Sequence, residues 1–72
     1  MELTVVVHQE RQGFWSEIEE LPGCFASGRT LVELREALAE AVGMYFSGPP
    51  VDLDRQPIQQ GRLTLRVSDP PA

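Results

Sequence analysis

The chain has 72 residues, a formal net charge of −5 and a single cysteine. A chain of this length forms one domain with a small core, and one cysteine excludes the internal disulfide that often supports small folds. Self-association is the support that remains, and the negative charge argues against direct binding to nucleic acid phosphates.

The N-terminal stretch predicts neither a leader nor a membrane anchor. "MELTVVVHQE" starts acidic and lacks the basic region and the small-residue cleavage site of a signal peptide. The apolar runs along the chain are far too short to span a bilayer. We therefore expect a cytoplasmic protein without membrane contact.

Two strands joined as a hairpin are predicted next. Leu3–Glu10 is rich in β-branched residues, and the segment from Phe14 to Glu20 alternates in part between apolar and polar side chains. Pairing residue 9 with residue 14 leaves a four-residue loop, Glu10–Gly13. This register puts one set of apolar side chains on a common buried face: Leu3, Val5, Val7, Phe14 and Ile18.

The stretch "ELPGCFASGRT", residues 20–30, holds the only cysteine. Pro22 presets φ at about −65°, and Gly23 accepts the positive φ that a type II turn needs at the next position. The chain therefore reverses here, and a short strand, "CFASG", follows. A reactive thiolate needs a nearby cation, helix N-terminus or histidine, and the sequence places none of these close to Cys24. We predict that Cys24 is a small buried residue and not a nucleophile.

A helix is predicted after this short strand. Thr30 and Glu33 form the capping box T-x-x-E, and apolar residues then recur at spacings of three and four. The stripe expected to face the sheet consists of Leu31, Leu34, Leu38, Ala41, Val42 and Tyr45. Gly48 is suited to the C-terminal cap, and Pro49 cannot continue the helix.

The remaining residues predict a loop at 49–61, a last strand at 62–67 and a disordered tail at 69–72. The order β-β-β-α-β predicts one α+β domain over residues 1–68. We expect two layers: a three- to four-stranded, mainly antiparallel sheet with one helix on one face. Since one helix covers only one face, the other face of the sheet stays open.

The open sheet face carries the candidate binding residues. It is mixed and acidic, and its one large aromatic, Trp15, is costly to expose and typical of an interface anchor. His8 has no second histidine with which to build a relay, and the sequence contains no phosphate-binding glycine loop or nucleophile motif. We therefore predict no enzyme activity, no catalytic, cofactor-binding or metal-binding residues, and a site for a protein partner. The predicted partner-binding residues are Val6, His8, Trp15, Glu17, Glu19 and Glu20.

The charge is unevenly placed along the chain. Residues 1–40 hold eight acidic and three basic side chains, whereas the remaining residues hold three of each. An acidic surface attracts basic partners by long-range electrostatics. The first half of the chain is therefore predicted to face a basic protein.

Residues 1–47 resemble the N-terminal domain of HicB-family antitoxins. The shared pattern is an acidic strand leading into Leu-Pro-Gly-Cys, then Gly-x-Thr, then a helix with a Glu-Ala repeat. The matching residues are Leu21, Pro22, Gly23, Cys24, Gly28, Thr30, Glu36 and Ala37. The resemblance implies a partial ribonuclease-H-like (RNase H-like) fold without nuclease activity. It also implies binding to a HicA-type toxin, a small basic mRNA-cleaving protein whose active-site histidine such antitoxins cover.

Two functions follow from these observations. The first is an antitoxin-like interaction protein that neutralises a HicA-type toxin. The second is a stand-alone, homo-oligomeric HicB-like module, a dimer or higher oligomer, that has no cognate toxin and binds another ligand. Many family members add a C-terminal DNA-binding module that residues 1–72 do not match, so we expect no direct binding to nucleic acid.

Overall fold

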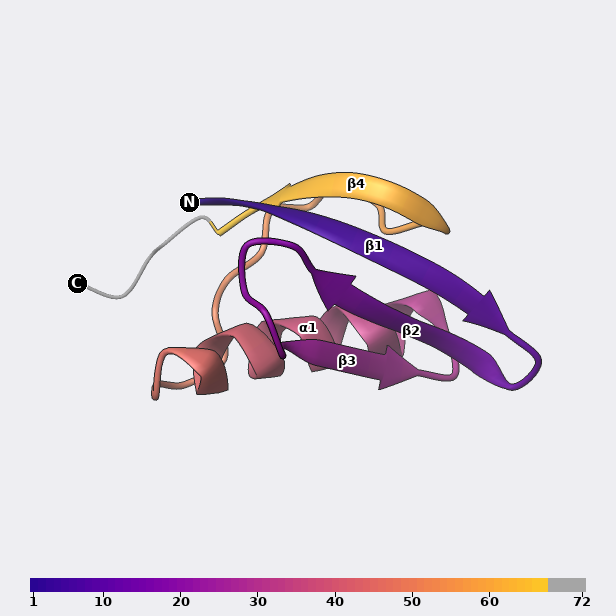
Figure 1. The fold of residues 1–72 in the computed structure, drawn as a ribbon, viewed down its shortest axis with the longest axis horizontal. Helices are drawn as coiled ribbons and strands as arrows, with labels where there is room; N and C mark the ends of the chain where they lie inside the picture. The colour runs from indigo at the N-terminus through magenta and orange to yellow at the C-terminus, as the bar shows by residue number, and fades with distance from the viewer. Residues whose placement is uncertain (68–72) are drawn as a thin grey trace.

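The fold consists of one antiparallel sheet and one helix (Figure 1). The structure, a computed structural model, describes residues 1–67. Its elements in chain order are β1 (Glu2–Glu10), β2 (Gly13–Ile18), β3 (Phe25–Gly28), α1 (Leu31–Tyr45) and β4 (Gly61–Arg66). The strands lie in the order β3-β2-β1-β4, and every neighbouring pair is antiparallel.

This architecture confirms the predicted two-layer α+β fold with one helix on one face of the sheet. The relation to RNase H, which the resemblance implies, stays a prediction. The predicted tail, 69–72, lies outside the described residues.

The β1–β2 hairpin has the predicted register. Gln9 pairs with Phe14, and Glu10 pairs with Gly13. Because the ladder continues to this last pair, the connecting loop contains two residues instead of the predicted four.

The core lies on the inner face of the sheet and draws on both layers. β1 alternates between buried and partly exposed side chains, as the sequence predicts for a strand with one covered face. The buried apolar residues are Leu3, Val5, Val7, Ile18, Leu21, Cys24, Ala26, Leu34, Leu38, Val42, Ile58, Leu65 and Val67. α1 packs on β3 and β2 only, so it covers one half of this face (Figure 1).

The Leu-Pro-Gly turn forms as predicted. The backbone N–H of Cys24 donates to the carbonyl of Leu21 over 3.0 Å. Gly23 has a φ of 85°, the positive value that the third position of a type II turn requires. β3 begins at Phe25, one residue later than predicted, and Cys24 is buried just before it.

The start of α1 explains the Gly-x-Thr spacing. The N–H of Glu33 donates to Oγ1 of Thr30 over 3.1 Å, and the Glu33 carboxylate accepts from the N–H of Arg29 over 3.2 Å. A Cβ at Gly28 would lie 2.6 Å from the backbone nitrogen of Leu34. Glycine at position 28 therefore lets the first turn of the helix press against β3 while the threonine two residues later caps it.

The helix ends in a Schellman motif whose left-handed residue is Ser47, not Gly48 as predicted. Ser47 has a φ of 59°. Its N–H donates to the carbonyl of Met44 over 2.9 Å, and the N–H of Gly48 donates to the carbonyl of Gly43 over 2.8 Å. Gly48 therefore takes the position after the left-handed residue.

One member of the predicted helix stripe does not reach the core. Leu34, Leu38 and Val42 are buried as predicted, but Tyr45 is 46% exposed. Tyr45 lies in the last turn of α1 and lines a shallow hollow with Gly23, Cys24 and Phe25, where β3 begins. Its ring instead contacts Phe46 edge-on, with ring centroids 5.4 Å apart.

The long connection between α1 and β4 covers the half of the sheet that α1 leaves free. Ile58 is buried in the core, and Leu53 forms a bridge with Val67. The guanidinium of Arg35 on α1 donates to the carbonyl of Gln56 over 2.8 Å. This segment is therefore anchored at both layers.

Candidate functional site

Four of the six predicted binding residues, Val6, His8, Trp15 and Glu17, gather on the face of the sheet opposite α1, and Glu19 and Glu20 lie in the turn that follows β2. Val6 lies opposite Glu17 and His8 opposite Trp15 in the β1–β2 ladder, and cross-strand partners project from the same face. Within residues 1–67 no helix covers this face. We call it the outer face. Its strand residues are Glu2, Thr4, Val6, His8, Trp15, Glu17, Phe25, Ser27, Arg62, Thr64 and Arg66.

Trp15 is half-buried in the outer face, whereas the sequence predicted an exposed aromatic. The ring of His8 stacks on it, with centroids 4.2 Å apart and planes 20° from parallel. Phe25 approaches from the other side at 6.4 Å. His8 Nε2 lies 2.9 Å from Oε2 of Glu17. The indole is therefore held in one position before any partner arrives.

The carboxylates beside Trp15 already have partners in the chain. Glu17 pairs with His8, and Oε1 of Glu19 lies 2.8 Å from the guanidinium of Arg62 on β4. Both pairs are partly exposed, and exposed pairs of this kind contribute only about 0–1 kcal/mol. A basic group of a partner can exchange with His8 or Arg62 at little cost.

The Glu20 carboxylate supplies hydrogen-bond acceptors to β1 just beyond the end of β2. The backbone N–H of Thr4 donates to Oε1 of Glu20 over 2.6 Å, and the hydroxyl of Thr4 donates to Oε2 over 2.7 Å. The hydroxyl hydrogen bond first, and the backbone one next, hold the pKa of Glu20 below its ordinary value of 4.5. Glu20 is therefore a structural group as well as a predicted binding residue.

Phe25 is a member of this site that was missing from the prediction. It lies opposite Glu17 in the β2–β3 ladder and is 60% exposed. Strand alternation counted outward from a buried Cys24 places Phe25 on the outer face, so the signal was present in the sequence.

A groove runs along the free side of β3, and we call it the β3 groove. Its volume is about 370 Å³. It is lined by Trp15, Phe25, Ala26, Ser27, Ala37, Glu40, Ala41 and Met44. The groove thus joins the aromatic side chains of the outer face to one side of α1, and Glu40 is the only charged residue that lines it.

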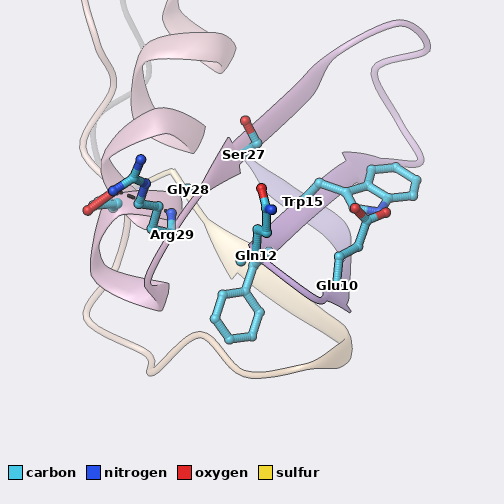
Figure 2. Close-up of a pocket in the computed structure, with 9 residues that line it drawn as sticks. Glu10, Gln12, Trp15, Ser27, Gly28 and Arg29 are labelled. Carbon is cyan, nitrogen blue, oxygen red and sulfur yellow. Dashed lines mark hydrogen bonds between the residues drawn. The ribbon is translucent and has the colours of Figure 1, made fainter.

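A second hollow, of about 330 Å³, lies at the hairpin end of Trp15. Figure 2 shows Glu10 beside Trp15 on the hairpin side and Arg29 at the start of α1. Among residues 1–67, neither Glu10 nor Arg29 has an ion-pair partner. Glu33 also lines the hollow, at the Arg29 end, so the hollow presents charges of both signs to a polar ligand or partner.

Cys24 does not contribute to the outer face. It is buried in the core, and this burial raises the pKa of its thiol. His8 projects from the opposite face of the sheet, so the two cannot form a thiolate–imidazolium pair. This placement agrees with the predicted structural role.

The described part of the chain, residues 1–67, contains no group of three or more His, Cys, Asp or Glu side chains arranged to hold a metal ion.

None of the helical residues within 1–67 forms a span long and apolar enough to cross a membrane.

Comparison of the chain with protein-family models, with curated proteins and with solved structures gave no match.

Proposed function

We propose that the chain is an antitoxin-like interaction protein that binds and neutralises a small, basic, HicA-type mRNA-cleaving toxin. The observation that carries this proposal is the outer face itself. It presents a positioned tryptophan, with Phe25 beside it and Glu17 in the same row, on a sheet face that no helix covers within residues 1–67. Aromatic anchors surrounded by polar groups are the usual energetic centres of protein interfaces.

The charge distribution supports a basic partner. Residues 1–40 carry a net charge of −5, from eight acidic and three basic side chains. Glu36 and Glu40 on α1 have no hydrogen-bond or ion-pair partner among residues 1–67. Such charges steer encounter with a basic protein, while the aromatic centre holds the complex together once water is excluded.

Co-expression tests the proposal directly. The chain is expressed with the small basic HicA-type reading frame that lies nearest to its gene. We expect growth to be restored and a complex to be recovered. Trp15→Ala should abolish rescue, and Val32→Ala, at an exposed position of α1 outside the outer face, should retain it. Persistent growth arrest with soluble chain and no complex would contradict the proposal.

The stand-alone, homo-oligomeric module is the second candidate function. The β3 groove favours it, because Phe25 and Met44 are among the most exposed large apolar side chains and both lie there. In that case the chain would assemble normally and show no effect on any neighbouring toxin.

A further inference from the structure

The two edges of the sheet differ in how they are protected. At the β4 edge, Leu53 forms a bridge with Val67, and the N–H of Asp54 donates to the carbonyl of Arg66 over 2.9 Å. β4 also carries Arg62 and Arg66, and charged side chains discourage edge-to-edge pairing. Within residues 1–67 the β4 edge is thus partly paired and charged.

The β3 edge has none of these protections. β3 is the terminal strand of the sheet, and no described strand pairs with its free side. Its sequence, Phe25–Gly28, contains neither a charged residue nor a proline. A terminal strand of this kind offers backbone N–H and C=O groups to another strand.

The surface beside this edge is apolar in both layers. On the sheet side Phe25 is 60% exposed, and on the helix side Met44 is 75% exposed. Ala37, Ala41 and Met44 recur at spacings of four and three, so they form one stripe along α1. Two alanines in that stripe allow a neighbouring helix to approach closely.

We propose that the β3 edge and the α1 stripe bind a second copy of this chain. The two β3 strands pair antiparallel about a two-fold axis that is perpendicular to the sheet, and the two α1 helices pack against each other. An isologous interface needs a patch that complements itself. An open strand edge and an apolar helix stripe on the same side of the molecule both meet this requirement.

Both elements of this side lie along the long axis of the molecule (Figure 1). A standard interface covers about 800 Å² per partner. β3 is only four residues long, so the dimer needs the α1 stripe as well as the strand edge. The β3 groove shares Trp15 and Phe25 with the outer face, so the dimer interface borders the proposed toxin site. This symmetry leaves both outer faces on the same side of the dimer.

Sedimentation velocity on the full chain tests the interface. We expect wild type to dimerise and Met44→Glu to weaken the dimer at least about tenfold. Val32→Glu is the matched control, because Val32 is 70% exposed on the same helix but does not line the β3 groove. It introduces the same charge and should leave the dimer unchanged, and circular dichroism verifies that both variants remain folded.

A gain of affinity provides a second test. Glu40 lines the β3 groove, so the dimer brings two copies of this carboxylate near the axis. Glu40→Gln should tighten the dimer at low salt, and added salt should tighten the wild-type dimer, because both reduce like-charge repulsion. A wild-type chain that stays monomeric, or equal effects of Met44→Glu and Val32→Glu, would overturn the proposal.

Discussion

At the scale of single residues, burial decides the role of Cys24. The side chain is 6% exposed, and burial raises the pKa of the thiol, so the neutral form dominates. We expect Cys24→Ser to lower the free energy of unfolding by about 1–3 kcal/mol, because a hydroxyl is buried in place of a weakly polar thiol. Urea denaturation measures this change. Cys24→Ala is the control for lost volume, and rapid modification of the native thiol by a small reagent would contradict the structural role.

Glu20 makes stability depend on pH. Its hydrogen bonds to Thr4 lower the pKa of the folded-state carboxyl below the ordinary value of 4.5. Over the acid range the unfolded chain therefore binds more protons than the folded chain. The stabilisation is fully present above that value and is lost as pH falls through the folded pKa.

The variant Glu20→Gln tests this linkage. We expect it to be less stable than wild type near neutral pH, and the difference in the free energy of unfolding should shrink as the solution is acidified. Glu36→Gln removes a carboxylate without a hydrogen-bond partner in residues 1–67 and should not reproduce this loss. A difference between wild type and Glu20→Gln that stays constant down to strongly acid pH would refute the linkage.

The residue scale also shows which contacts the sequence predicts. The type II turn at Pro22 and Gly23 was predictable because its determinants are neighbours in the chain. The contact between Glu20 and Thr4 spans 16 positions. It depends on where β2 stops relative to β1, and no local pattern in the sequence encodes that end point.

At the scale of elements, the two ends of α1 differ in how well the sequence predicts them. The N-terminal cap needs only Thr30 and Glu33, so the motif was sufficient. The C-terminal cap depends on a tertiary contact. A Cβ at Gly43 would clash with the carbonyl oxygen of Pro49, so the returning chain passes close to the helix just after the turn in which Ser47 takes the left-handed conformation.

Replacing Ser47 by glycine should stabilise the protein. A residue with a side chain is destabilised by roughly 1–2 kcal/mol in the left-handed region. Glycine removes this strain, but its greater freedom in the unfolded chain offsets part of the gain in stability. We expect Ser47→Gly to raise the free energy of unfolding by about 0.5–1 kcal/mol. Thermal denaturation measures it, with Ser47→Ala as the control that keeps the strain. A lower melting temperature for Ser47→Gly would show that the hydroxyl matters more than the backbone.

The connection between α1 and β4 was the element least predictable from sequence. Its prolines and glutamines read as a loop, and it contains no regular element in the structure. Its fixed course comes from single long-range contacts, such as Ile58 in the core and the Arg35 hydrogen bond to Gln56. These have no periodicity, and periodicity is the signal on which sequence prediction depends.

At the scale of the whole molecule, the contacts of the candidate site are of two kinds. Contacts between segments that are adjacent in sequence were predictable, and contacts that depend on the assembled sheet were not. Hairpin pairing brings Val6, His8, Trp15 and Glu17 together, and this was predictable because both strands are adjacent in sequence. The sequence did not predict that Arg62 pairs with Glu19, because β4 lies next to β1 only through the strand order β3-β2-β1-β4. Which carboxylates are already neutralised is therefore a property of the assembled sheet.

The candidate site combines a positioned aromatic with paired carboxylates, and these two features predict two separable effects on toxin binding. Trp15→Ala should mainly speed dissociation and weaken binding by about 2 kcal/mol or more, because the stacked indole is the desolvated anchor in the proposed complex. The double variant Glu17→Gln and Glu19→Gln should mainly slow association and reduce its salt dependence, since it removes negative charge and leaves His8 and Arg62 unpaired.

Surface plasmon resonance with the partner recovered by co-expression, at several salt concentrations, separates the two rates. Val32→Ala serves as the control outside the outer face. If Trp15→Ala changed neither rate, the partner would have to bind elsewhere, and the outer face would lose its assigned role.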